Sequence, residues 1–468
     1  MLSPLIRRPR RNVVLCSKER GFTMAFVAIT IVAIISMAAL SIDIGTLYEA
    51  RAEAQRAADA AALTAAQVIS ASGITGDPAN ATSSWQLICD GASSPASAAA
   101  ISVAQQNSIG GVAASTINVY YGTNGGAGPN ADCTGAGAAF GINPIVTVNV
   151  QRPNLPIFFA RIFSLFGSTY SSTSVSASAT AEVFNPSNSG SVTSSSALIP
   201  VAPRCVKPWI VPNIDPTTGQ PFINLTDGSI VNPGILPLGK GVIGENFNVA
   251  ADCHRGRANC SGANMIANPP ASTGGLIHYV PALIQGTPVA FSSCSKANPF
   301  QEAIGGCDQS TVYACGTLLG AQADLTENPV NPGNLSGDTG TAAQCLIHSA
   351  SGGQDQLNTA SFPFQLQAGS ANPLVTNGVV SSSSLITTSN SIVTIPVYDS
   401  TAGTLAGTQP QVTIVGFLQV FIGDLGGTGE LNVYVMNVAG CGNGKTTAVS
   451  STAVLGTSPV PVRLITPP

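Results

Sequence analysis

The chain has 468 residues, of which 44% are hydrophobic and only 9% are charged, and its formal net charge at pH 7 is −4. This length and apolar content can fill the cores of two or three domains, which excludes wholesale disorder. The low charge excludes a basic surface for nucleic acid and a strong field that would steer a charged substrate. These features suit a secreted or cell-surface β-protein whose exterior is made polar by Ser, Thr, Asn and Gln.

The first predicted element is a transmembrane helix over residues 22–42. This segment contains no charged residue, and a helix of its length rises about 31 Å, which matches one hydrocarbon core. A cleavable signal peptide would have a shorter apolar region and a small-residue processing site, so we expect an anchor that is retained. The segment before the span has one acid, Glu19, and six basic residues: Arg7, Arg8, Arg10, Arg11, Lys18 and Arg20. The positive-inside rule therefore predicts an inner (cytoplasmic) membrane protein with residues 1–21 in the cytoplasm and the bulk periplasmic or extracellular.

The helix is predicted to continue out of the membrane over residues 43–70, where proline is absent and Gly45 is a weak breaker. Alanines recur there at three- and four-residue spacing and form a small-residue face. This face has two interpretations, packing against the chain's own downstream domain and packing on a partner's similar helix. Asp43, at the membrane edge, also has two: an interfacial residue in water, and a residue that docks on a partner's backbone or arginine.

Residues 71–184 are predicted to form a mixed α/β region that completes an extracytoplasmic module over residues 43–184. The expected elements are a helix over Ser97–Gln106, strands over Ile117–Tyr121 and Ile145–Val150, a short amphipathic helix within Leu155–Gly167, and a strand of strict alternation that ends at Phe184. Residues 185–196, NPSNSGSVTSSS, lack bulky side chains and are predicted to be a linker.

Residues 197–468 are predicted to form a β-rich domain, because glycine and proline are frequent and make long helices unfavourable. The expected strands are Gly275–Val280, Thr287–Phe291, Ser391–Val397, Gln411–Ile422 and Glu430–Val438. The predicted fold class is thus α+β and membrane-anchored, with one N-terminal helix followed by a β-rich domain linked by disulfides.

Ten of the eleven cysteines follow the predicted span, in a compartment that favours disulfides. They are Cys89, Cys133, Cys205, Cys253, Cys260, Cys294, Cys307, Cys315, Cys345 and Cys441. We expect most of them to be paired, although some could be buried free thiols, and the sequence selects no connectivity. The cluster from Cys253 to Cys260 is interpreted as a disulfide loop rather than a metal site, since no Cys-x-x-Cys is present and the three histidines are scattered.

The residues around the span resemble the N-terminal module of TadG-like proteins of the Flp (tight adherence) pilus assembly system. The resemblance rests on residues in fixed order: Arg20, Gly21, Asp43, Gly45, Tyr48, Arg51, Gln55, Ala57, Ala58, Asp59, Ala60, Ala61, Ala62 and Leu63. It extends more weakly to Phe158-Phe159 and the alternation Val175 to Ala181, so it covers about residues 20–184. It implies a pilus-assembly role with other pilus-assembly or envelope proteins as partners.

Two departures from related patterns matter. Gly21-Phe22 resembles a type IV prepilin processing site, but the glutamate expected five residues after the cut is Phe26 here. Asp308-Gln309-Ser310-Thr311-Val312 lacks the last serine of the Asp-x-Ser-x-Ser motif that some TadG-like proteins carry in a von Willebrand A domain. We therefore expect neither pilin-type processing nor that domain.

The strongest chemical motif is a relaxed Walker A pattern over residues 439–446. A P-loop needs its lysine and threonine at the start of a helix, whereas the residues that follow favour a strand or loop, so a glycine-rich turn is the better interpretation. Histidines and carboxylates are too sparse to indicate a hydrolase triad or a glycosidase pair.

The sequence thus predicts a non-enzymatic, membrane-anchored component of Flp pilus assembly or anchoring, with no catalytic residue, cofactor, metal or nucleic-acid partner. The alternatives are a surface adhesin or ligand-binding protein on a TadG-like anchor, and a secreted hydrolase whose site is unrecognised.

Overall fold

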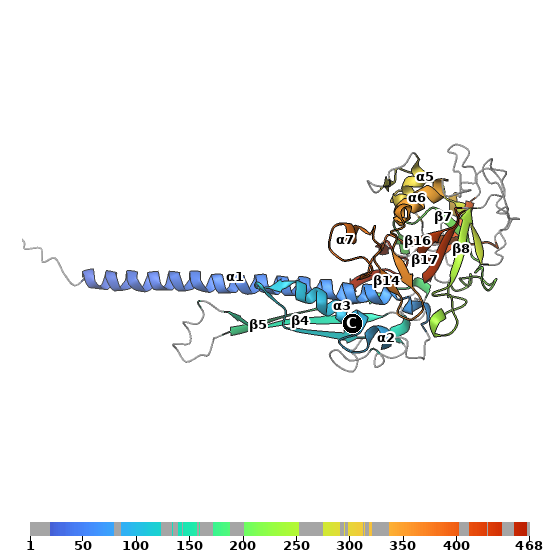
Figure 1. Ribbon diagram of the computed structural model, residues 1–468. Helices are drawn as coiled ribbons and strands as arrows, with labels where there is room; N and C mark the ends of the chain where they lie inside the picture. Colours follow the sequence, from blue (N-terminus) through green and yellow to red (C-terminus); the bar gives the residue numbers. More distant parts are fainter. Residues whose placement is uncertain are drawn as a thin grey trace, which may run out of the picture.

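A long helix, α1 (Glu19–Ala71), extends from a β-rich body in the computed structural model (Figure 1). The structure describes residues 19–78, 86–122, 133, 139–142, 144–156, 159, 172–187, 201–251, 275–290, 294, 298–311, 313, 318–320, 337–401, 411–427, 429–441 and 454–465. At 53 residues, α1 is about 80 Å long. The predicted span and the predicted alanine-rich helix are therefore one continuous helix.

The sequence explains why α1 is continuous and why it ends where it does. It contains no proline, and the helix runs through Gly45 without a break. A Cβ at Gly45 would meet nothing within 4 Å, so no close contact requires a glycine at this position. The helix ends before Gly73, which has φ +75°, a conformation that glycine adopts without strain. A Cβ on Gly73 would also lie 2.5 Å from the carbonyl oxygen of Met436, so the chain can turn here only without a side chain.

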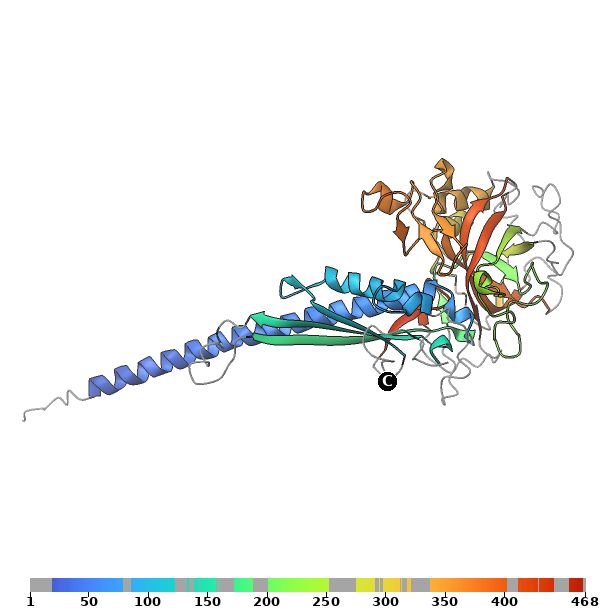
Figure 2. The same cartoon turned by 60° about the horizontal axis from the view of Figure 1, so that its bottom comes forward.

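The second half of α1 packs against an antiparallel sheet of order β20-β5-β4-β3. Its strands are β3 (Thr116–Tyr121), β4 (Ile145–Pro156), β5 (Ser172–Val183) and β20 (Val462–Ile465). Figure 1 and Figure 2 show β4 and β5 running along α1 toward its N-terminal half. A further helix, α3 (Pro95–Gln106), also packs on α1, and we call α1, α3 and this sheet the helix–sheet unit.

Several short elements accompany the helix–sheet unit. They are η1 (Ile74–Gly76), α2 (Gln86–Cys89), β1 (Ser108–Ile109), β2 (Val112–Ala113) and α4 (Ala139–Ile142). Inside the unit, the hydroxyl groups of Tyr121 and Ser97 lie 2.7 Å apart and join β3 to α3. A disulfide between Cys89 and Cys133 joins α2 to a segment that follows β3.

The body of the molecule is built around strands whose pairings close on themselves, in the order β17-β16-β7-β9-β8-β18 and back to β17. We call these strands the β-ring: β7 (Trp209–Pro212), β8 (Asn246–Ala251), β9 (Leu276–Pro281), β16 (Ile392–Tyr398), β17 (Gln411–Leu425) and β18 (Leu431–Gly440). Two pairings are parallel, β16 with β7 and β8 with β9, and the others are antiparallel.

The remaining elements surround the β-ring. They are β6 (Val201–Pro203), η5 (Leu236–Leu238), β10 (Val289–Ala290), α5 (Pro299–Gly305), β11 (Gly306–Cys307), β12 (Leu318–Gly320), α6 (Asp338–Leu346), η7 (Ser349–Ser351), β13 (Gln356–Asn358), β14 (Gln365–Gln367), α7 (Pro373–Thr376), β15 (Leu385–Ile386) and β19 (Val454–Gly456). Disulfides Cys205–Cys307 and Cys294–Cys345 link these peripheral segments. The prediction of an α+β chain with one apolar N-terminal helix and a disulfide-linked β-rich domain is confirmed.

The predicted short helix within Leu155–Gly167 begins differently in the structure. Leu155 and Pro156 are the last residues of β4, and Phe159 lies in a bend. Leu155 is buried, and the pairing of β4 with β5 extends the strand beyond the alternating run that ends at Val150. The rest of that predicted helix lies outside the described residues.

Two findings bear on the predicted domain boundaries. Asn185, the first residue of the predicted linker, is buried and hydrogen-bonded, and residues 188–196 lie outside the described residues. In addition, β20 belongs to the sheet of the helix–sheet unit, although the sequence division assigns it to residues 197–468. The pairing of Arg463 with Glu182, by a salt bridge and a hydrogen bond, helps to hold β20 on β5.

Candidate functional site

The first half of α1 has the properties of a membrane span. Among the described residues, α1 is the one helix long and apolar enough to cross a membrane, with an 18-residue window of mean hydropathy 2.6 that is not buried at all. The hydroxyl groups of Thr30 and Ser36 donate to the carbonyl oxygens of Phe26 and Val32, one turn earlier. The helix therefore satisfies these polar groups internally, as a hydrocarbon environment requires. Phe22, beside the site that resembles a prepilin cleavage point, lies within this helix and is 76% exposed.

The second half of α1 buries its alanine face inside its own chain. The buried residues are Ala50, Ala54, Ala57, Ala58, Ala61, Ala62, Ala65 and Ala66. They face α3, whose buried Ala96, Ala100 and Ala104 recur every four residues, and β5, whose buried Ala177, Ala179 and Ala181 alternate with Ser178 and Thr180. Small side chains on both sides allow the backbones to approach closely. The interpretation that this face packs against the chain's own domain is confirmed, and its use as a docking face for a partner helix is wrong because it is already covered.

Asp43 is buried at the end of the apolar half of α1. Its carboxylate oxygen Oδ2 accepts a hydrogen bond of 2.9 Å from the backbone N–H of Phe159, beyond the end of β4. Only 4% of Asp43 is exposed, so its interpretation as a residue in water is wrong. The other interpretation expected Asp43 to dock on the backbone of a partner protein. In the structure, the backbone N–H that it binds belongs to the same chain. Asp43 thus attaches the far end of the β4–β5 hairpin to the helix at the edge of the predicted span.

The other motif residues divide into two groups. Ala57, Ala58, Ala61 and Ala62 form part of the buried face, and Asp59, Ala60 and Leu63 are half-buried beside it. Gly45, Tyr48, Arg51 and Gln55 are exposed. Gln55 donates hydrogen bonds to Asp59 at 2.8 Å and to the carbonyl of Ser178 at 3.2 Å, so it joins α1 to β5. Packing therefore explains the alanine block of the motif, whereas Tyr48 and Arg51 face solvent.

The C-terminal end of α1 is attached to the β-ring and to the chain before β20 by buried polar groups. Asn437 of β18 donates to the carbonyl of Ser70 at 2.9 Å, and the hydroxyl of Ser70 donates to the carbonyl of Val460 at 2.9 Å. Asn185 donates to Thr75 at 3.1 Å and to the carbonyl of Val438 at 3.0 Å. Because unpaired buried polar groups are costly, these bonds fix the helix–sheet unit against the β-ring.

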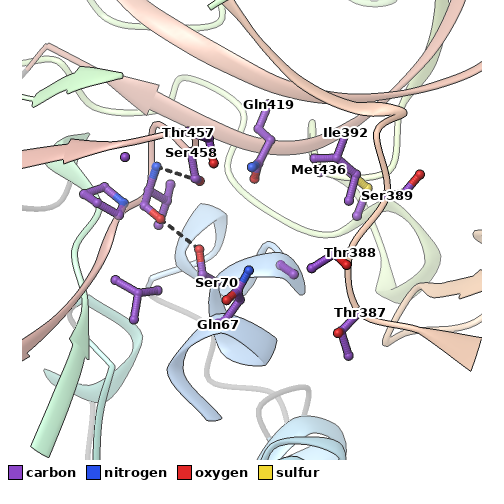
Figure 3. Close-up of a pocket in the computed structure, with 15 residues that line it drawn as sticks. Gln67, Ser70, Thr387, Thr388, Ser389, Ile392, Gln419, Met436, Thr457 and Ser458 are labelled. Carbon is purple, nitrogen blue, oxygen red and sulfur yellow. Dashed lines mark hydrogen bonds between the residues drawn. The ribbon is translucent and has the colours of Figure 1, made fainter. Parts of the chain in front are cut away.

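A cavity of about 310 Å³ lies at this junction (Figure 3). Its polar lining comes from hydroxyl and amide side chains, and none of the lining residues is charged. The lining residues are Gln67, Ser70, Ala71, Thr387, Thr388, Ser389, Ile392, Gln419, Met436, Gly456, Thr457, Ser458, Val460, Pro461 and Val462. Hydroxyl and amide groups can donate hydrogen bonds to a neutral polar ligand and accept hydrogen bonds from it. The lining supplies neither a carboxylate nor an imidazole for acid–base chemistry.

Two buried ionisable groups lie elsewhere in the body. Burial lowers the pKa of Lys207 to about 7, and its ammonium donates to the carbonyl oxygens of Ile304 and Gly306, both at 2.7 Å, at the end of α5. Burial, together with the neighbouring carboxylate of Asp215, raises the pKa of Glu245 to about 8. Lys207 thus satisfies the last carbonyls of a helix, and Glu245 holds a proton beside a second carboxylate.

The remaining motifs have local structural roles where they are described. A Cβ on Gly440, within the Walker-like pattern, would lie 2.1 Å from the carbonyl oxygen of Gly228, so close packing explains this glycine; residues 442–446 lie outside the described residues. Asp308 accepts hydrogen bonds from Ser310 and Thr311 and stabilises a turn.

Within the described ranges there is no group of three or more His, Cys, Asp or Glu that could hold a metal ion. Cys253, Cys260 and Cys315 lie outside those ranges, while Cys441 is disulfide-bonded.

The apolar and alanine-rich halves of α1 together match one known family model, Tad, described as "Putative Flp pilus-assembly TadE/G-like". Residues 21–68 are thus similar to TadE/G-like pilus-assembly proteins. The resemblance predicted from the sequence is confirmed over this segment, and the match supports a part in the Flp pilus system. Its weaker extension to residues 158–184 stays a prediction. No curated protein and no solved structure matches the chain.

The sequence did not indicate the residues that attach the TadE/G-like helix to the rest of the chain. Asn437 and Ser70 are 367 positions apart, and Asp43 and Phe159 are 116 positions apart. Single asparagines and serines occur throughout this chain, so only a three-dimensional structure could have selected these.

Proposed function

We propose that this protein is a non-enzymatic component of Flp pilus assembly or anchoring, held in the inner membrane by residues 22–42 with residues 1–21 in the cytoplasm. The observation that carries the proposal is the TadE/G-like helix itself, which exposes an apolar half and builds its other half into the helix–sheet unit. The Arg-rich segment before the span supports the orientation.

This arrangement suits an assembly component because it joins the membrane span rigidly to the body. No loop separates the two halves of α1, and hydrogen bonds from Asn437 and Asn185 attach its end region to β18. The β-ring is therefore held at a set height above the membrane. Its partners in this proposal are other pilus-assembly or envelope proteins that meet it at that height.

Deletion and complementation test the proposal. A strain that lacks the protein should lose surface Flp pili, and the full chain should restore them. The variant Ile31→Asp with Ile35→Asp places two charges in the span, which is unfavourable in a membrane, and should leave the membrane fraction and fail to restore pili. A control with Val379→Asp and Leu385→Asp, at exposed positions of the body, should restore them. Normal pili in the deletion strain would refute an assembly role.

Orientation is tested separately with reporter fusions. Fusions after Gln67 and after Ser196 should behave as exported, because both positions follow the span. Activity of these fusions only in the cytoplasm would reverse the proposed topology without affecting the assembly role.

A second candidate function is a surface adhesin or ligand-binding protein that uses a TadE/G-like anchor. The observation that favours it is the uncharged cavity beside Gln67 and Gln419, whose hydroxyl and amide lining suits a neutral polar ligand. A deletion strain with a normal number of pili but reduced surface attachment would favour this candidate over the first.

A further inference from the structure

We propose that one edge of β5, beside α1, is a docking site where a pilus-assembly partner adds an extended segment as a further strand of the sheet. This edge comprises residues 172–179, and we call it the open edge. The inference rests on the proposed function for the identity of the partner. It adds to that function the surface on which the partner binds and the form in which it binds.

The open edge follows from the register of β5. On one side, β4 pairs with β5 between residues 172 and 182. On the other side, β20 pairs with residues 180–183 alone, and among the described residues no strand lies beside the rest of β5. The remaining length suits a typical strand of about 5–6 residues. A segment added there would continue the row that β20 begins.

Backbone groups of β5 point toward the open edge. Successive residues of a strand direct their N–H and C=O groups to opposite sides. The N–H of Val183 donates to a carbonyl just before β4, and the N–H of Phe184 donates to a carbonyl just before β20. The even-numbered residues therefore face the side on which β20 lies. Ser176 and Ser178 are two of these residues, and they present their backbone groups to an added strand.

The open edge lacks the features that usually block strand addition. Natural edge strands are commonly protected by charged side chains or by proline. The sequence of the open edge, STSVSASA, contains neither. Val175, Ala177 and Ala179 are buried, and Ser176 and Ser178 are exposed but small. An incoming strand would therefore displace no bulky side chain from this edge.

The exposed motif residues of α1 lie beside the same edge. Gln55 donates to the carbonyl of Ser178 at 3.2 Å, so this face of the helix borders the open edge. Arg51 and Tyr48 precede Gln55 by four and seven residues and share its face. Tyr48 is 72% exposed, whereas Ala62, seven residues after Gln55 on that face, is fully buried. Packing within the chain explains Ala62, and a bound segment would explain Tyr48 and Arg51.

Charge and topology favour a partner protein over a second copy of this chain. Arg51 makes no salt bridge within the described part of the chain, and the open edge of a second copy has no carboxylate to offer. A second copy that paired antiparallel through this edge would also point its α1 the opposite way, so the two spans could not enter one membrane. The occupant we infer is an extended segment with small side chains and a carboxylate that reaches Arg51.

Thiol labelling in cells tests the proposal on the full chain. Tyr48→Cys places a reporter thiol beside the open edge, and Glu49→Cys is the matched control at the same height on another exposed face of α1. Each variant is expressed in the piliated strain in place of the wild type, and also in a host without Flp pilus genes. After labelling with a membrane-permeant maleimide, mass spectrometry of the digested protein separates these positions from the native cysteines.

A second substitution tests whether the contact is a strand. Ser176→Pro removes the N–H that faces the open edge, whereas Ser176→Thr keeps it and favours a strand. Each is combined with the Tyr48→Cys reporter. Because this N–H bonds to no strand within the described chain, the purified Ser176→Pro protein in nanodiscs should fold and melt near the wild-type temperature. A variant that no longer folds would show that the chain itself uses this N–H and would overturn the open edge.

We expect the Tyr48→Cys reporter to be labelled several-fold more slowly in the piliated strain than in the host without pilus genes, while Glu49→Cys is labelled equally in both. Ser176→Pro should restore fast labelling in the piliated strain, and Ser176→Thr should not.

Three results would overturn the inference. Fast labelling of the Tyr48→Cys reporter in both hosts would mean that nothing occupies the open edge. Slow labelling in both would mean that the chain or a second copy covers it. Protection that persists in the Ser176→Pro variant would mean that the contact is not an added strand. Each result would leave the assembly role intact, since that role is refuted by normal pili in the deletion strain.

Discussion

The alanine face of α1 provides the sharpest test of the packing described above. Ala58 is fully buried, and Ala58→Leu adds three carbon atoms at a position where helix and neighbours already touch. If there were room, burying three carbons would stabilise the fold by about 2.4 kcal/mol. In a close-packed core, overpacking instead costs about 1–3 kcal/mol, because side chains and backbone must shift. Alanine and leucine both favour helix, so a loss cannot be attributed to helix propensity.

The assay is thermal unfolding of the purified full chain in lipid nanodiscs, followed by near-ultraviolet circular dichroism. A loss of 1 kcal/mol should lower the melting temperature of a unit of about 150–250 residues by roughly 2–4 °C. The matched control is Ala52→Leu, on the exposed side of the same helix, which should melt like the wild type. Equal melting temperatures for Ala58→Leu, Ala52→Leu and the wild type would refute the buried alanine face.

Three further predictions concern buried groups in other parts of the molecule. The pKa of Glu245 is raised from 4.5 to about 8. Its contribution to the free energy of unfolding is therefore complete below pH 4.5 and is lost as the pH rises through about 8. Glu245→Gln should remove this part of the pH dependence, which urea titrations across that pH range will measure. Removing the Cys89–Cys133 disulfide, which spans 44 positions, should lower the free energy of unfolding by about 4 kcal/mol, and a double alanine variant with the same melting temperature as the wild type would contradict this. Asn437→Ala removes the amide that donates to the carbonyl of Ser70 and to the side chain of Gln419, and it should cost about 1–3 kcal/mol in the same melting assay.

Elements with an uninterrupted local pattern were predictable from the sequence. Helix α1 follows from a proline-free run of apolar and alanine-rich residues, and β5 follows from the alternation of serine with valine and alanine. In both, each residue's environment depends on its neighbours in sequence, which a periodicity detects. The short helix predicted from Leu155 onward failed at its start because pairing with β5 extended β4 over Leu155 and Pro156. Tertiary pairing overrode a local preference there.

The junctions were not predictable because their partners are far apart in the sequence. Val462 pairs with Val183 on a neighbouring strand, and Asn437 reaches Ser70. Neither pair carries a periodic signal, and the cavity at this junction combines residues from α1, β17, β18 and the segments around β15 and β19. The candidate anchor, the apolar half of α1, was therefore predictable from the sequence, whereas the contacts around the C-terminal end of α1 were not.

The pairing of β20 with β5 has a consequence for how the protein is made. The sheet beside α1 is complete only when residues 462–465 have been synthesised, long after residues 180–183 have left the ribosome. Until then, the edge of β5 over those residues has no strand beside it, and unpaired edges invite wrong partners. All the strands of the β-ring, from β7 to β18, are synthesised during this interval. The sheet beside α1 is therefore completed late in synthesis, and chains released before residue 462 would display an open edge of β5.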